Sequence, residues 1–192
     1  MIRLLCATGN VGKLREFRMA GGTAIEIDLL PGFRDISPCV EDAATFEENA
    51  IKKALYYGQF APGLLFADDS GLEVTALGGA PGVLSARFAG PDATDEANNG
   101  LLLQKLENVS DRSARFVCAI ALVEGGHVRG VFHGRVAGFI SRTPRGTAGF
   151  GYDPLFYYPP FGCTFGQATA EQKLKASHRG HALRAMIASL PL

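Results

Sequence analysis

Hydrophobic and polar positions change their spacing several times near the start of the chain. Residues 2–7 form a short apolar run that stops at Thr8-Gly9-Asn10, which predicts a buried strand ending in a loop. Apolar side chains then recur every third position over residues 11–17, as on one face of a helix. Residues 25–29 alternate apolar and acidic side chains, which predicts a half-buried strand.

A second helix and two more strands are predicted next. Thr45-Phe46-Glu47-Glu48 has the capping-box pattern, and apolar residues follow it at helical spacing. A strand over residues 64–67 is expected to carry Asp68-Asp69-Ser70 at its carboxyl end, and residues 72–77 predict another short strand. Glycine and proline over residues 78–92 predict a long ordered loop, a kind that is often functional.

The second half of the chain is predicted to contain a hairpin between two helices. Residues 94–106 have helical apolar spacing, and a closing helix is expected to start at Ser177. Two β-rich runs, over residues 115–123 and 127–140, flank Gly125-Gly126 as in a hairpin. Strands that alternate with helices, plus one antiparallel hairpin, predict an α/β fold with a mixed sheet. Ligands in such folds gather at loops that follow the carboxyl ends of strands.

Composition limits the class of protein. With 192 residues and 47% hydrophobic content, the chain is long enough for one sizeable domain, residues 1–192, and two lobes are compatible with this length. Nineteen basic and nineteen acidic residues cancel, so we expect neither nucleic-acid binding nor membrane binding by general electrostatics. Any phosphate binding should therefore be local.

The cysteines and the amino-terminal segment indicate a cytoplasmic protein. Cys6, Cys39, Cys118 and Cys163 are scattered without zinc-ligand spacing, which predicts mostly buried free thiols in a reducing compartment. The first apolar run is too short for a signal peptide, and no run approaches the length of a membrane span.

The turn after the first strand has the features of a phosphate cradle. Glycines let backbone N–H groups approach phosphate oxygens, a helix amino terminus carries partial positive charge, and Lys13 adds a full charge. The GxxxxGK[ST] spacing of a Walker A loop is absent. Taken alone, an ordinary strand-to-helix turn explains the segment equally well. The residues concerned are Thr8, Gly9, Asn10, Val11, Gly12 and Lys13.

Asp68-Asp69-Ser70-Gly71 places two carboxylates side by side, and taken alone this spacing favours a β-turn. Neighbouring carboxylates repel each other, however, and a hard cation such as Mg²⁺ relieves the repulsion. Because side chains alternate on a strand, the two aspartates need not reach one ion together. Glu47 and Glu48 are explained by a helix start, whereas Glu41 lies outside that explanation and is the candidate third carboxylate.

The carboxyl-terminal third offers an aromatic surface and two cations. The rings of Phe150 and Tyr152 are expected to form a stacking surface for a base. Ser177 is placed to cap a helix whose first turn holds His178 and Arg179, and positive charge there predicts a nearby anion or acceptor. A phosphate cradle, a carboxylate cluster and a stacking surface together predict a nucleotide site with a metal.

Longer motifs carry a resemblance to a known family. The sequence closely resembles the inosine/xanthosine triphosphate pyrophosphatase family, which hydrolyses deaminated purine nucleoside triphosphates. The resemblance covers nearly the whole chain, in the family's order. The motifs are ATGNVGKLREF, TFEENAIKKA, ADDSGLEVTALGGAPGVLSARFAG, TPRGTAGFGYDPLF and EQKLKASHRGHAL.

This resemblance implies an elongated, two-lobed fold with a central substrate cleft, usually a homodimer, that cuts between the α- and β-phosphates. It implies that Thr8 to Lys13 hold phosphates, that Glu41 and Asp69 bind Mg²⁺, and that Asp69 is the general base. Asp68 is expected to support the metal, Lys13 to stabilise the departing pyrophosphate, and Ser70 to contact substrate. Base and sugar contacts are implied for Phe150, Gly151, Tyr152, Asp153, Lys173, His178 and Arg179.

Substrate choice leaves alternatives. A donor such as Arg179 at the base edge favours a 6-oxo purine (ITP, dITP, XTP) over adenine, but the rejection of guanine does not follow from these residues. One alternative is a related pyrophosphatase for pyrimidine triphosphates (dTTP, UTP), which is not expected to carry FGYDP and SHRG. Another is a catalytically silent nucleotide-binding module, which the intact DDSG motif disfavours.

Overall fold

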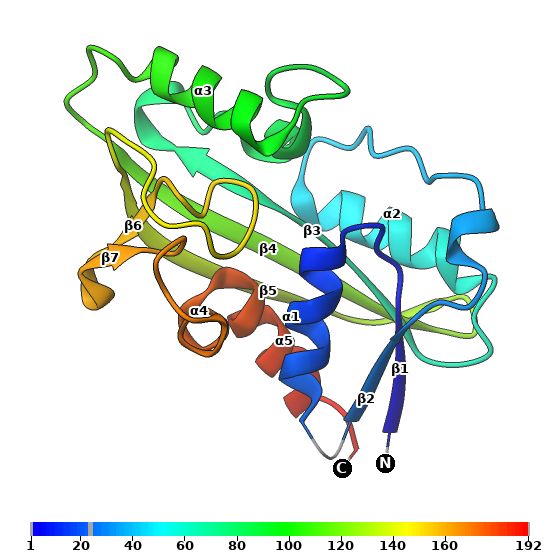
Figure 1. Ribbon diagram of the computed structural model, residues 1–192. Helices are drawn as coiled ribbons and strands as arrows, with labels where there is room; N and C mark the ends of the chain where they lie inside the picture. Colours follow the sequence, from blue (N-terminus) through cyan, green and yellow to red (C-terminus); the bar gives the residue numbers. More distant parts are fainter. Residues whose placement is uncertain (1, 23–24, 192) are drawn as a thin grey trace. The chain divides into compact units, whose positions relative to one another are not determined.

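The computed structural model describes residues 2–22 and 25–191 (Figure 1). Seven strands within these residues form one sheet in the order β2-β1-β3-β4-β5-β6-β7. The strands are β1 (Ile2–Cys6), β2 (Ile25–Leu29), β3 (Leu65–Val74), β4 (Ser113–Glu124), β5 (His127–Ile140), β6 (Phe156–Tyr158) and β7 (Cys163–Thr164). The α-helices are α1 (Val11–Gly21), α2 (Phe46–Gly58), α3 (Asp95–Lys105), α4 (Ala170–Ala176) and α5 (His178–Ala188).

The sheet is mixed, as predicted. Strand β1 runs parallel to both β2 and β3, whereas β6 is antiparallel to β5 and to β7. Strands β4 and β5 are neighbours joined by Gly125 and Gly126, whose φ angles of 56° and 80° suit the tight turn of a hairpin. The predicted α/β fold with flanking helices is therefore confirmed.

The chain separates into two compact units. The first unit contains residues 1–69, 118–134 and 178–192, and the second contains residues 70–117 and 135–177. Strands β3, β4 and β5 contribute residues to both units. None of the helices in the described residues is long and apolar enough to cross a membrane.

Helices and strands of the first unit share a tightly packed interior. Helix α1 packs against β2 and against α5 (Figure 1). The buried rings of Phe17 on α1 and Phe66 on β3 meet edge to face, with centroids 5.0 Å apart. Asn10 caps α1, because its side chain accepts a hydrogen bond from the Lys13 N–H. The phosphate-cradle segment is thus anchored at a helix start.

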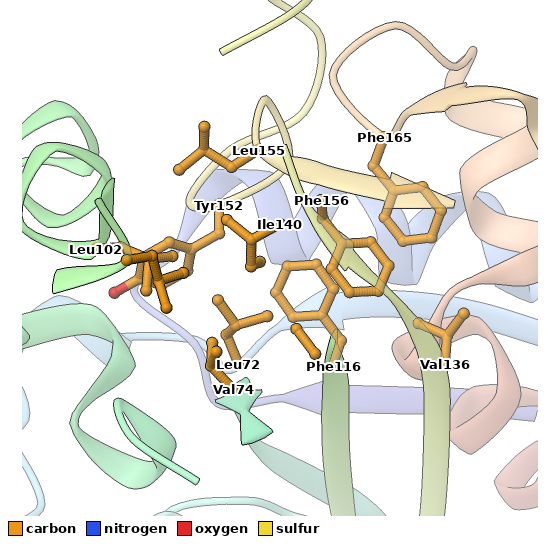
Figure 2. Close-up of a cluster of buried hydrophobic side chains, with 12 residues drawn as sticks. Leu72, Val74, Leu102, Phe116, Val136, Ile140, Tyr152, Leu155, Phe156 and Phe165 are labelled. Atoms are coloured by element: carbon orange, nitrogen blue, oxygen red, sulfur yellow. The ribbon is translucent and has the colours of Figure 1, made fainter. Parts of the chain in front are cut away.

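Aromatic and aliphatic side chains pack together in the interior of the second unit (Figure 2). Phe116 on β4 lies with its ring centroid 4.5 Å from that of Phe156 on β6, and Phe165 packs against both. Leu72 and other aliphatic residues surround these rings. This cluster ties the second-unit parts of β3, β4 and β5 to the segment that contains β6 and β7.

Strand β3 corrects the prediction of two short strands separated by a turn. It runs unbroken from Leu65 to Val74, so DDSG lies inside a strand, and residues 75–77 form a 3-10 turn. Position 71 requires glycine because residues 82–85 approach its backbone too closely for a side chain. A Cβ at this position would lie 2.3 Å from Ser85 Oγ and 2.6 Å from the Gly82 carbonyl oxygen. A close approach of residues 82–85, and not a turn, explains the glycine of this motif.

Gly134→Ala is expected to destabilise the first unit. A Cβ at Gly134 on β5 would lie 1.8 Å from the carbonyl oxygen of His178 and 2.7 Å from the Ala182 nitrogen, both in the backbone of α5. Since backbone atoms cannot rotate away, we expect a loss of about 1–3 kcal/mol of unfolding free energy, or more. Thermal unfolding would measure it as a melting temperature several degrees lower. Gly63→Ala is the control, because nothing lies within 4 Å of its added Cβ, and an equal shift in both variants would contradict the argument.

Candidate active site

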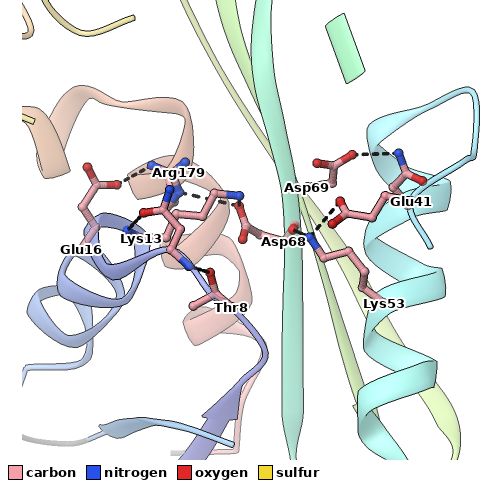
Figure 3. Close-up of polar contacts among 10 residues, drawn as sticks. Thr8, Lys13, Glu16, Glu41, Lys53, Asp68, Asp69 and Arg179 are labelled. Atoms are coloured by element: carbon pink, nitrogen blue, oxygen red, sulfur yellow. Dashed lines mark hydrogen bonds and ion pairs between the residues drawn. The ribbon is translucent and has the colours of Figure 1, made fainter. Parts of the chain in front are cut away.

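Asp68 and Asp69 point to opposite sides of β3, as expected for adjacent residues of a strand (Figure 3). Both are buried, with 1% and 7% of their surface exposed. A carboxylate this deep needs cations or hydrogen bonds to remain charged. The two aspartates meet this need with different partners.

Asp68 faces two cations. Lys13 Nζ lies 2.9 Å from Asp68 Oδ2, and Arg179 Nε lies 3.7 Å from the same oxygen. Burial by itself raises the pKa of Asp68, but Lys13, Arg179 and Lys53 together outweigh it and hold this pKa far below its usual range. Asp68 is therefore a permanently charged anchor for the cations of α1 and α5.

Arg179 in turn is held by Glu16. Its Nη1 donates to the Glu16 carboxylate on α1, and only 3% of the Arg179 side chain is exposed. Burial opposes the charge of Arg179, but Glu16 and Asp68 raise its pKa further above the usual value. For Arg179, the anion predicted near the start of α5 is present in the form of two carboxylates of the protein. His178 beside it is also buried.

Asp69 lies on the side of β3 that faces α2 (Figure 3). Its Oδ2 accepts a hydrogen bond of 3.0 Å from Asn49 Nδ2. Burial raises the pKa of Asp69 above its usual value, and Glu41 adds to this, although Lys53, Lys13 and the Asn49 amide act in the opposite direction. A buried carboxylate with a raised pKa is the type of group that removes a proton from water.

Lys53 connects Glu41 to the strand. Its Nζ donates to Glu41 Oε2 at 3.1 Å and to the main-chain carbonyl oxygen of Asp68 at 2.7 Å. Burial lowers the pKa of Lys53, but Asp68, Glu41 and Asp69 outweigh it and raise this pKa. Lys53 is therefore the positive charge that balances the carboxylates on this side of β3.

The described residues contain no group of three or more His, Cys, Asp or Glu side chains placed to hold a metal ion. The expected cluster of Glu41, Asp68 and Asp69 is not assembled, because the Asp68 carboxylate points to the opposite side of β3 (Figure 3). Glu41 and Asp69 do lie on one side of the strand, and each influences the charge of Lys53. Two carboxylates fit Mg²⁺, which often takes one or two from the protein and the remainder from phosphates and water.

Three residues of this site were missed in the sequence: Lys53, Asn49 and Glu16. Lys53 follows Asn49 by four positions on α2, and it falls on the same stripe as the buried Ala50 and Ala54. A lysine on an apolar stripe requires an anionic partner, and that was the available signal. No local pattern distinguishes Glu16 from an ordinary exposed helical glutamate.

The cradle residues differ in exposure. Thr8 is nearly buried, and its Oγ1 accepts from the Asn10 N–H at 3.1 Å. The Val11 side chain is 76% exposed, Gly9 is also exposed, and Gly12 lies in the first turn of α1. Ser70 is half-buried and is the first residue of the second unit.

The second unit gathers three of the predicted base-binding residues. Lys173 Nζ pairs with Asp153 Oδ2 at 2.5 Å, and both side chains are buried. Asp153 Oδ2 also accepts from the Phe150 N–H at 2.9 Å. Lys173 Nζ lies 4.5 Å from the centre of the Phe150 ring, a cation–π contact. The half-buried Phe150 ring is therefore fixed from its backbone and from its face.

Tyr152 does not supply the stacking surface that its position suggested. It is 4% exposed, belongs to the apolar interior of the second unit (Figure 2), and its hydroxyl donates to the Ser85 carbonyl oxygen at 2.8 Å. An aromatic residue next to Gly151 cannot be assigned to the surface or the interior from local sequence, because the distant core determines which way it turns.

The sequence matches a known protein family over nearly its whole length. Residues 4–189 match the Ham1 family. The chain belongs to the Ham1 family. The resemblance inferred from the five motifs is confirmed by relatives named dITP/XTP pyrophosphatase.

Ham1 relatives cover nearly the full chain. A dITP/XTP pyrophosphatase of Acidobacterium capsulatum is 48% identical over 99% of this chain and 98% of its own length. One of Syntrophobacter fumaroxidans is 50% identical over 94% of this chain and 78% of its own length. The Ham1 protein of Staphylococcus aureus has the same fold, with a TM-score of 0.85 at 40% identity, covering 97% of this chain and 96% of that one.

Proposed function

We propose that this chain hydrolyses deaminated purine nucleoside triphosphates, namely ITP, dITP and XTP, to the monophosphate and pyrophosphate. The observation that carries the proposal is the pair of buried aspartates on β3, one bound to the cations of α1 and α5 and the other held on the α2 side by Asn49. Relatives at 48% and 50% identity that are named dITP/XTP pyrophosphatases support the substrate class.

In the proposed reaction, residues 8–13 bind the phosphates. Lys13, at the start of α1, is placed to stabilise negative charge on the departing pyrophosphate. Asp69 takes a proton from the attacking water, and its hydrogen bond from Asn49 fixes the position of the carboxylate. Asp68 keeps Lys13 and Arg179 in place when no substrate is bound.

Mg²⁺ is the proposed cofactor, held by Glu41 and Asp69. When bound there it would neutralise phosphate charge and make the attacking water easier to deprotonate. We assign Asp68 to the cations of α1 and α5 and leave it out of the metal site, because its carboxylate lies across β3 from Glu41.

Removal of divalent metal is expected to abolish turnover and to leave the fold intact. The described contacts of the fold need no metal, whereas the triphosphate would meet two unneutralised carboxylates at Glu41 and Asp69. The measurement is dITP hydrolysis after treatment with a chelator, followed by addition of Mg²⁺, with melting temperature as the control. Full activity in excess chelator would contradict the metal assignment.

The base is proposed to bind the second unit. The face of Phe150, with Lys173 and Asp153 beside it, offers stacking, a donor and an acceptor to a purine. Gly151 and Tyr152 lie between Phe150 and Asp153 in the chain, and their hydrogen bonds keep this segment in place. By resemblance, His178, Arg179 and Ser70 also contact the substrate. The ion pairs of Arg179 favour a position beside the phosphates over the base edge predicted from the sequence.

Product analysis tests the proposal. The protein is incubated with dITP, XTP, ATP, GTP and dTTP in Mg²⁺, and the products are identified. We expect fast formation of monophosphate and pyrophosphate from dITP and XTP alone. Release of orthophosphate, equal rates on ATP, or a preference for dTTP would overturn it.

A cytoplasmic homodimer completes the proposal. The four cysteines are all free thiols, two buried and two half-buried, which suits a reducing compartment. The homodimer is proposed from the family resemblance. Phe139 on β5 is 49% exposed and lines a groove of about 760 Å³ in the second unit. None of the predicted site residues lines this groove. Sedimentation at several protein concentrations tests the dimer.

A further inference from the structure

The backbone N–H and the carbonyl oxygen of Gly151 both form hydrogen bonds to one helix of the second unit, α3. The Gly151 N–H donates to Asp95 Oδ2 at 2.6 Å, and the Gly151 carbonyl oxygen accepts from Asn99 Nδ2 at 3.0 Å. Asp95 and Asn99 are four residues apart on α3, so they share one face of it. Both polar groups of a single residue are thereby tied to a rigid element.

Asn98, the neighbouring residue on α3, holds a second loop. Its Oδ1 accepts from the Ala89 N–H at 2.8 Å, and its Nδ2 donates to the Ala86 carbonyl oxygen at 3.1 Å. The Tyr152 hydroxyl binds the Ser85 carbonyl oxygen within this same stretch. Helix α3 therefore joins the residue 85–89 segment to the Gly151 segment.

Gly151 sits in the middle of the proposed base site. Phe150 precedes it and Asp153 follows it, and these two are bound to each other and to Lys173. Gly151 has a φ of 63° and Gly149 one of 77°, a backbone conformation that glycine adopts freely and leaves freely. Without an external hold, this segment would lose the fixed position of the Phe150 ring.

We propose that Asp95 and Asn99 are positioning residues for the purine base. They hold Gly151 so that Phe150, Asp153 and Lys173 are in place before the nucleotide arrives, which lowers the ordering cost of binding. This inference rests on the proposed function, and it assigns to α3 a role that acts through Gly151 and not by contact with the substrate.

Asp95→Ala and Asn99→Ala test the inference, with Glu96→Ala as the matched control. Glu96 is also acidic, exposed and in the first turn of α3, so its replacement removes the same favourable charge from the helix start. Asp95→Asn is the rescue variant, because its amide oxygen can still accept from the Gly151 N–H. Each variant is assayed for KM and kcat with dITP, and for inhibition by inorganic tripolyphosphate, which has no base.

Loss of one hold should raise the KM for dITP about 3- to 10-fold with a smaller change in kcat. Inhibition by tripolyphosphate should stay near wild type in every variant. Glu96→Ala and Asp95→Asn should also keep a KM for dITP near that of wild type. An unchanged KM in both alanine variants, a parallel loss of tripolyphosphate inhibition, or an equal effect of Glu96→Ala would overturn the inference. If the wild-type protein fails to hydrolyse dITP, the proposed function fails instead, so the two failures are distinguishable.

Discussion

Asp69→Asn is expected to lower kcat for dITP hydrolysis by a factor of about 10²–10⁴, the usual contribution of a positioned general base. The substitution preserves shape, and its amide oxygen can still accept the hydrogen bond from Asn49 Nδ2. The carboxylate that would take the proton from water is lost. Steady-state kinetics with saturating Mg²⁺ measure the change, and binding of dITP should remain detectable by calorimetry.

Two comparisons make the Asp69 result specific. Glu26→Gln makes the same carboxylate-to-amide change at an exposed position on β2, and it should leave kcat unchanged. The melting temperature of Asp69→Asn should stay close to that of wild type. If Asp69→Asn retained full turnover, the base would have to be another group, and a catalytically silent module would be ruled out at the same time.

Local sequence predicted the parts of this fold whose causes are local. The apolar run of β1, the amphipathic helix α1 and the tight Gly125-Gly126 turn all follow from neighbouring residues, and the structure confirms each. Thr45 also caps α2 as its motif predicts, because its Oγ1 accepts from the Glu48 N–H. These contacts span at most four residues along the chain, so sequence spacing determines them.

The interior of the site depends on contacts that spacing does not encode. Arg179 reaches Glu16 across 163 positions, and Lys53 reaches the Asp68 carbonyl oxygen across 15. Taken alone, two adjacent aspartates indicate a turn, because unpaired charges would not be stable inside a buried strand. The cations that stabilise them here come from distant positions in the chain. The unbroken course of β3 therefore could not be predicted from DDSG alone.

Lys53→Met is expected to reduce kcat/KM about 5- to 100-fold and to lower the melting temperature. Methionine fills a similar volume but removes the hydrogen bond from the charged Lys53 Nζ to the Asp68 carbonyl oxygen, a loss of about 1.5–3 kcal/mol. Glu41 and Asp69 also lose a positive charge that stabilises both, so they repel each other more strongly on one side of β3. Either effect moves Asp69 from its working position.

Added Mg²⁺ should raise the melting temperature of Lys53→Met by more than it raises that of wild type. The reason is that a divalent cation can replace the lost positive charge beside Glu41 and Asp69. Lys52→Met is the matched control. This neighbouring lysine pairs with Asp42, whose side chain is 66% exposed, and exposed pairs contribute little to stability. Equal losses of kcat/KM and of melting temperature in the two variants would mean that any lysine on α2 contributes only through its charge, wherever it lies. A loss confined to Lys53→Met, reduced by Mg²⁺, would assign this lysine to the metal side of the active site.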